Sequence, residues 1–196
     1  MIRHLPLAVL VAVSLGLAAS AQTTSRGAPA LATAHDRLTD SFGRLAAGQV
    51  LFGANVLAAT FEAALLRSRE TARDGSEAIP DDIREALLPF YPAELLAEVR
   101  YKIGDVSPDG LAGFAIRNGN AAAVTLVDTI VFKNETHVKN LALWAHEIHH
   151  VHQYREWGTD GFAARYAFGW VDVENEATSR ARDFVSWYKD RTASLR

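Results

Sequence analysis

The chain has 196 residues, of which 49% are hydrophobic, no cysteine, and a formal net charge of −3 at pH 7. This length suffices for one domain with a sizeable core, and the lack of cysteine excludes a disulfide-stabilised scaffold. No basic patch stands out on this negatively charged chain, so we expect no nucleic-acid partner.

The first residues have the features of a secretory signal peptide. Arg3 precedes an apolar run from Leu5 to Leu17, and Ala19-Ser20-Ala21 forms an A-x-A cleavage site. The run is short for a bilayer span, so we expect cleavage after Ala21 and no stable membrane span afterwards. The sequence therefore predicts a periplasmic or secreted bacterial protein.

Three segments follow the predicted signal peptide, residues 1–21. Residues 22–34 contain Ser, Thr, Gly and Pro, and we expect a disordered entry segment. Residues 35–75 are rich in Ala and Leu, and no proline occurs between His35 and Thr71, which predicts an N-terminal helical segment. Residues 76–196 form the predicted main domain.

The main domain is predicted to begin with helices and to continue into a strand. Pro80 opens a helix whose first turn carries Asp81 and Asp82, where carboxylates favour the positive end of the helix dipole. The run from Val124 to Phe132 is rich in β-branched residues and predicts a strand. These elements indicate an α+β fold that is mainly α-helical.

The most informative motif is H-E-x-x-H at His146-Glu147-Ile148-His149-His150, inside a predicted helix from Leu141 to Tyr154. His146 and His150 lie one turn apart on one helix face and can supply two of the four ligands of a zinc ion, with Glu147 beside them as general base. The opposite face, predicted to be buried, is apolar; it carries Leu141, Trp144, Ile148 and Val151. The motif predicts a zincin-like active-site helix, and the alternative is a solvated, histidine-rich helix face.

A third zinc ligand must come from a histidine or carboxylate, because the chain has no cysteine. Glu174 and Glu176 both lie downstream at a distance that a turn can fold back. Helical spacing favours Glu174, because Arg180 lies four residues after Glu176 and predicts an exposed ion pair there. We therefore expect Glu174 as the ligand and keep Glu176 as the alternative.

Other side chains near the motif have two interpretations each. His149 is either a group that contacts the ligands or the substrate, or a solvated histidine, and His152 is expected at the edge of the core. Tyr154 lies one turn beyond His150 and can donate its hydroxyl to a developing oxyanion, or it packs the helix. Tyr166 carries the same ambiguity.

The motif order resembles that of the eCIS-core family of zinc metallopeptidases, named from extracellular contractile injection systems. The resemblance covers roughly Pro80 to Phe184; it rests on the strand Ala123–Phe132, the run Leu141–Tyr154, Gly161-Phe162, Tyr166 and Glu174-x-Glu176-Ala177. It implies a gluzincin-like site in which His146, His150 and Glu174 hold zinc and Glu147 is the general base. Thr178 departs from the acidic residue that many gluzincins have there.

Together these features predict a secreted or periplasmic zinc peptidase that hydrolyses peptide or protein substrates through a zinc-activated water. Two alternatives belong to other classes of protein. One is a non-catalytic, metal-stabilised binding or structural module linked to a secretion or toxin system. The other is a metal-free helical protein that contacts the cell envelope through residues 35–71.

Overall fold

The computed structural model describes residues 53–104, 110–118 and 121–194 of the chain. These residues form an α+β fold that is mainly helical and contains one four-stranded sheet, which confirms the predicted fold class. No helix within the described ranges is long and apolar enough to cross a membrane.

The described residues divide between two compact units, and those from residue 58 onward belong to the first unit. The predicted signal peptide, the predicted entry segment and residues 35–52 of the predicted helical segment lie outside the described residues. Residues 53–73 are helical.

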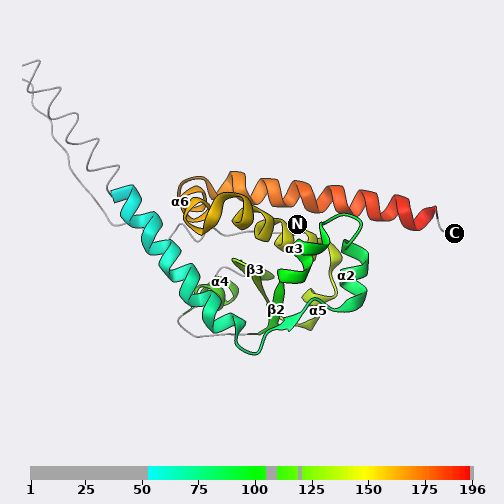
Figure 1. Cartoon of the computed structure of the whole chain (residues 1–196), viewed down its shortest axis with the longest axis horizontal. Helices are drawn as coiled ribbons and strands as arrows, with labels where there is room; N and C mark the ends of the chain where they lie inside the picture. The colour runs from blue at the N-terminus through cyan, green and yellow to red at the C-terminus, as the bar shows by residue number, and fades with distance from the viewer. Residues whose placement is uncertain (1–52, 105–109, 119–120, 195–196) are drawn as a thin grey trace, which may run out of the picture. The chain divides into compact units, whose positions relative to one another are not determined.

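Figure 1 shows the elements of the first unit after the helix that ends at residue 73. In chain order they are β1 (Glu77–Ala78), α2 (Asp81–Leu87), α3 (Ala93–Glu98), β2 (Arg100–Ile103), α4 (Leu111–Asn118), β3 (Ala123–Leu126), β4 (Thr129–Phe132), α5 (Glu135–Val138) and α6 (Leu141–Ala193). As predicted, α2 begins directly after Pro80 and carries Asp81 and Asp82 in its first turn.

The sheet has the strand order β1-β2-β4-β3 and is mixed. β2 and β4 run parallel, whereas β1 pairs with β2 and β3 pairs with β4 in antiparallel fashion. The predicted single strand from Val124 to Phe132 is therefore wrong, because the chain reverses at Val127 and Asp128 to form a hairpin. Most residues of β3 and all of β4 are buried, and the run is rich in β-branched residues on both sides of the turn, where Asp128 is its one charged residue.

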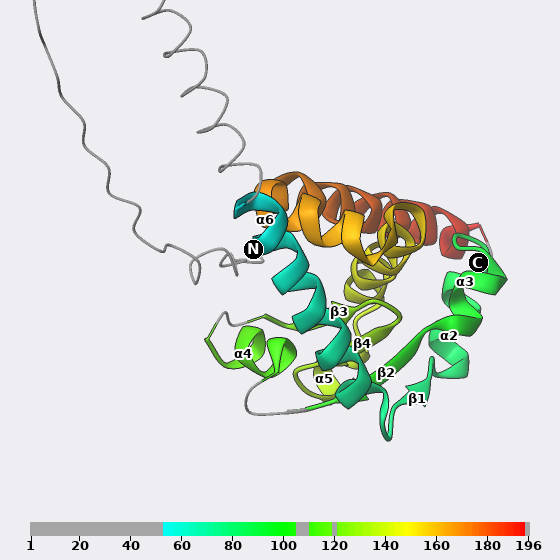
Figure 2. The ribbon, with the colours of Figure 1, turned by 60° about the vertical axis from the view of Figure 1, so that its left-hand side comes forward.

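Helix α6 is a long element with two breaks. It begins at Leu141 because the Asn140 side chain caps it by accepting hydrogen bonds from the amides of Ala142 and Leu143. Gly158 has φ +73° and Gly169 also leaves helical geometry, so the chain changes direction at both. We call residues 141–157 the motif arm and residues 170–193 the return arm, and Figure 2 shows the chain folding back between them.

Two groups of buried residues pack on opposite sides of the motif arm. The first core cluster joins the apolar face of the motif arm to α2, α3, the sheet and the return arm; it includes Leu87, Leu96, Phe132, Trp144, Ile148, Val151 and Phe184. The second core cluster joins the helix that ends at residue 73 to β3 and α6; it includes Leu65, Leu126, Tyr154, Phe162 and Val173. Burial of Trp144, Ile148 and Val151 confirms the predicted apolar face.

Candidate metal centre

Three predicted ligands meet where the return arm passes the motif arm. The Nε2 atoms of His146 and His150 lie 3.2 Å apart. Glu174 Oε2 lies 3.3 Å from His146 Nε2, and Glu174 Oε1 lies 3.6 Å from His150 Nε2. Because one ligand atom from each residue lies within 4.8 Å of the others, these residues form a group that could hold a metal ion. We call them the metal group.

The separations within the metal group suit a tetrahedral zinc ion. Nitrogen and oxygen ligands at the usual zinc distances are about 3.3–3.6 Å apart when the coordination is tetrahedral. The three separations, 3.2, 3.3 and 3.6 Å, fall at or close to this range, with one Glu174 oxygen facing each histidine. Two imidazoles and one carboxylate are also a donor set that zinc accepts, although other divalent ions bind such sites as well.

Glu174, on the return arm, is the buried negative charge of the metal group. Burial raises the pKa of this carboxyl, but hydrogen bonds from His146 and His150 outweigh burial and hold the pKa far below its usual range. Burial lowers the pKa of His150, yet the hydrogen bond and charge of Glu174 raise it to about 9. The carboxylate is therefore ionised and attracts positive charge, which a proton or a metal ion can supply.

Tyr166 holds one oxygen of the Glu174 carboxylate. Its hydroxyl donates a hydrogen bond of 2.9 Å to Glu174 Oε1. Burial and the negative charge of Glu174 raise the pKa of Tyr166 well above its usual range, so the hydroxyl keeps its proton and remains a donor. The two sequence interpretations of Tyr166 did not include this contact, because nothing in the local spacing indicates which carboxylate the ring reaches.

Glu147 is buried beside β3 and is not a member of the metal group. The hydroxyl of Thr125 lies 2.7 Å from Glu147 Oε2 and 3.2 Å from the Glu147 backbone carbonyl, so it can donate to either. Thr125 was not singled out in the sequence, because it lies in an apolar run and is brought to Glu147 only by the hairpin. The contact fixes the carboxylate that we predict to be the general base.

Glu176 lies outside the metal group and contacts other side chains. Its Oε2 accepts a hydrogen bond from Gln153, and its Oε1 lies 3.4 Å from His149 Nε2. We expected Arg180 to form an ion pair with Glu176. The Arg180 guanidinium instead lies 4.0 Å from the ring centre of Phe90. The geometry therefore groups Glu174, and not Glu176, with the two histidines that we predict to be ligands.

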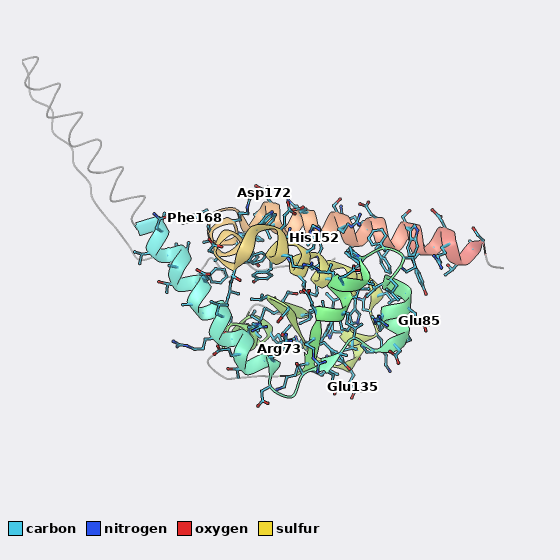
Figure 3. All side chains as sticks on the ribbon, viewed as in Figure 1. Arg73, Glu85, Glu135, His152, Phe168 and Asp172 are labelled. Carbon is cyan, nitrogen blue, oxygen red and sulfur yellow. The ribbon has the colours of Figure 1, made fainter. Side chains whose placement is uncertain are left out.

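His149 and His152 differ in burial. His149 is buried, which contradicts a solvated histidine, and burial lowers its pKa despite the nearby charge of Glu176. His152 is about half exposed and lies 3.7 Å from Glu156 one turn further on. Figure 3 labels His152 on α6. The ring of His152 stacks on His149 at 5.6 Å, so it covers the buried ring from outside.

Aromatic rings line the second core cluster next to the metal group. Phe162 stacks on Tyr154 and Tyr166, and its ring meets His150 edge to face at 6.1 Å. Phe61, on the helix that ends at residue 73, stacks on Tyr166 at 5.9 Å. The result is a closed site, in which His146, Glu147 and His150 are 5%, 4% and 5% exposed.

Tyr154 is buried, and burial raises the pKa of its hydroxyl. The hydroxyl lies near the backbone of Val127 and makes no hydrogen bond within the described ranges. Val127 has φ +60°, a backbone conformation that a β-branched residue rarely adopts. The predicted contact of Tyr154 with an oxyanion stays a prediction.

Comparison with known families finds a partial match. Residues 78–158 match the family model described as the eCIS core domain. No curated protein and no solved structure matches the chain. The matched segment contains His146, Glu147 and His150 but ends before Glu174, so the family resemblance is confirmed over a shorter range than Pro80 to Phe184. Zinc binding and peptidase activity stay predictions.

Proposed function

We propose that the chain is a zinc-dependent metallopeptidase that hydrolyses peptide or protein substrates. The observation that carries this proposal is the convergence of His146, His150 and Glu174 at separations that suit tetrahedral zinc. A separate buried carboxylate, Glu147, is tied to Thr125 and is left out of the metal group. A peptidase of this class needs both parts, three protein ligands and one general base.

The chemistry divides between the metal and the chain's own residues. When bound, zinc polarises the scissile carbonyl and lowers the pKa of a water molecule towards about 7. Glu147 takes a proton from the water and passes it to the leaving amine, so no covalent intermediate is required. Because Thr125 occupies Glu147 Oε2, we assign the proton transfer to Oε1. Tyr166 keeps the Glu174 carboxylate in place.

Substrate access requires movement of the residues that close the site. His146, Glu147 and His150 are each at most 5% exposed, which leaves no room for a peptide bond to contact them. The aromatic contacts of Phe61, Tyr166 and Phe162 are the ones that must loosen. β3 stands at the end of the sheet order and can then pair with an extended substrate backbone.

The same burial favours a second candidate function, a metal-stabilised binding or structural module. Structural zinc sites are closed, whereas catalytic sites keep one position open. In that case the metal group would stabilise the contact between the motif arm and the return arm, and Glu147 would have no chemical role. The two candidates agree on metal binding and differ only in turnover.

We propose that the protein works outside the cytoplasm, secreted or in the periplasm, in connection with an extracellular contractile injection system. The match of residues 78–158 to the eCIS core domain supports the connection. The A-x-A site at Ala19-Ser20-Ala21 supports export, although it lies outside the described residues. Detection of the mature chain outside the cytoplasm, beginning at Gln22, would test export, and co-purification with the particles of such a system would test the connection.

The deciding experiment replaces Glu147 by Gln, with Glu156→Gln as the matched control. Both glutamates lie on the motif arm, but Glu156 is exposed and its ion-pair contact is with the half-exposed His152. We expect Glu147→Gln to reduce hydrolysis of a mixed peptide library by at least about 100-fold while zinc content stays the same. Glu156→Gln should leave both unchanged.

Two results would count against the peptidase. Equal turnover in Glu147→Gln and the unaltered chain would remove Glu147 from the mechanism. Zinc binding without hydrolysis of any peptide, in a chain whose closing aromatic contact is loosened by Phe61→Ala, would favour the structural module.

A further inference from the structure

Gln153 lies between the two arms of α6 and is fully buried, with 0% of its surface exposed. On one side, its Oε1 lies 2.8 Å from His150 Nδ1. On the other side, its Nε2 donates to the Val173 carbonyl at 3.3 Å and to Glu176 Oε2 at 2.9 Å. One amide therefore touches a predicted metal ligand on the motif arm and two residues of the return arm that flank Glu174.

The direction of these hydrogen bonds is fixed by chemistry. A backbone carbonyl and a carboxylate can only accept, so the NH₂ group of Gln153 must face Val173 and Glu176. Its Oε1 must then face His150, and this oxygen can only accept. His150 Nδ1 must therefore carry a hydrogen. The ring loses its Nε2 hydrogen when a metal binds, so the lone pair of the neutral ring is then on Nε2. That atom is the one that faces His146 Nε2 and the Glu174 carboxylate.

From this network we propose that Gln153 is a positioning residue for the metal group. It selects the tautomer of His150 that presents Nε2, and it ties the return arm at Val173, next to Glu174. This inference rests on the metal group of the proposed function and does not require peptidase activity. The partner that a metal-bound histidine needs on its other nitrogen is here a neutral amide, held in one orientation by acceptors from a second arm.

A merely structural role is the competing interpretation, because Gln153 also joins the two arms. Gln153→Met keeps the size of the side chain but removes every hydrogen bond. Gln153→Glu keeps an acceptor for His150 Nδ1 and places a second carboxylate against Glu176. The double variant Gln153→Glu with Glu176→Gln restores a donor opposite the new carboxylate and keeps the acceptor for His150 Nδ1, while the Val173 carbonyl stays without its donor.

Tyr91→Phe is the matched control for loss of a buried hydrogen bond to the motif arm. The Tyr91 hydroxyl donates to the carbonyl of Ala145 at 2.7 Å, and Ala145 directly precedes His146. This variant should lower the melting temperature without changing either nitrogen of His150. It therefore separates a general loss of stability from a specific loss of ligand orientation.

The experiment measures the zinc dissociation constant of the full chain by chelator competition, together with ¹⁵N NMR of the histidines in the zinc-loaded protein. We expect Gln153→Met to bind zinc about 10- to 100-fold more weakly and to lose the defined Nδ1–H signal of His150. The double variant should recover affinity to within a few-fold and regain the signal, and Tyr91→Phe should stay within two-fold of the unaltered chain.

The inference is overturned if Gln153→Met stays within two-fold of the unaltered chain, if Tyr91→Phe weakens zinc as much, or if the unaltered chain binds no zinc. Failure of the proposed peptidase looks different. If the variants follow the expected order of zinc affinity and no form of the chain hydrolyses peptides, the positioning role stands and the peptidase does not.

Discussion

The two faces of the motif arm are both buried but are held in different ways. Trp144, Ile148 and Val151 pack in the first core cluster, among buried hydrophobic side chains, and the Trp144 indole also donates a hydrogen bond to the Val138 carbonyl at 2.7 Å. His146 and His150 lie on the other face, among carboxylates, an amide and aromatic rings. The apolar face depends on shape and volume. The polar face depends on each buried group keeping its partner.

This difference indicates where the molecule gains its stability and where it keeps its chemistry. A cavity in an apolar cluster lowers the free energy of unfolding, but apolar contacts do not depend on charge or on hydrogen-bond direction. A buried polar group that loses its partner pays the full cost of desolvation. Substitutions on the apolar face should therefore change folding and leave zinc binding intact, and substitutions on the polar face should change zinc binding first.

The largest effect on stability is expected on the apolar side, from Phe184→Ala. Phe184 is 1% exposed and contacts the rings of Phe90, Trp187 and Tyr188. Removal of the ring should lower the free energy of unfolding by about 3–5 kcal/mol, measured by denaturant titration. The folded fraction should still bind one zinc per chain. Loss of zinc from folded protein would show that the two faces are not independent.

His150→Ala should have the largest effect on the polar face. Zinc at 100 times its dissociation constant should stabilise the unaltered chain by about 2.7 kcal/mol, whereas the variant should show no rise in melting temperature with zinc. His152→Ala is the control, because His152 is about half exposed and lies on the same arm. An equal zinc response in both variants would exclude His150 as a ligand.

The next effect concerns Asp128, at the hairpin turn beside the second core cluster. Arg69 donates two hydrogen bonds to its carboxylate and Arg73 a third, at 2.6–2.9 Å. Burial raises the pKa of Asp128, but these partners outweigh burial and hold it below its ordinary value of 3.8. Asp128→Asn should therefore cost about 1 kcal/mol at pH 7.

The sign of the pH dependence follows from this lowered pKa. The contribution of Asp128 is complete well above pH 3.8 and is lost as the pH falls through the folded-state pKa. The unaltered chain and Asp128→Asn should differ in melting temperature at pH 7 and converge on acidification. A constant difference down to the lowest pH would mean that the ion pairs contribute nothing.

The smallest effect is expected at Val127, whose φ of +60° suits the first loop residue of a hairpin that favours glycine. Val127→Gly and Val127→Ala both remove the two γ-methyl groups. Only glycine, which has no Cβ, relieves the backbone strain. Glycine should therefore be more stable than alanine here by about 1 kcal/mol, the reverse of the usual order. If alanine is the more stable in denaturant titration, the strain is absent.

Much of this arrangement follows from the sequence. The period of the apolar residues predicts which face of the motif arm packs in an apolar cluster, and the spacing of H-E-x-x-H places His146 and His150 together. Comparison of Glu174 and Glu176 also selects the carboxylate that the structure brings to the histidines. These features are local or depend on one helical turn, so the pattern of residues determines them.

The remaining features depend on contacts between distant segments. The hairpin at Val127 interrupts a run of β-branched residues that reads as one strand, and it brings Thr125 to Glu147. His149 is buried because the return arm covers it, which its polarity does not indicate. Gln153 was missed, since its importance rests on Val173, twenty residues later in the chain.

The most direct test of the account is the metal content of the chain itself. The chain is purified without a histidine tag or chelator, and its zinc is measured per monomer by elemental analysis. We expect about one zinc per chain in the unaltered protein and none in His150→Ala. Absence of zinc from the unaltered chain, even after dialysis against zinc, would contradict the proposed metal centre.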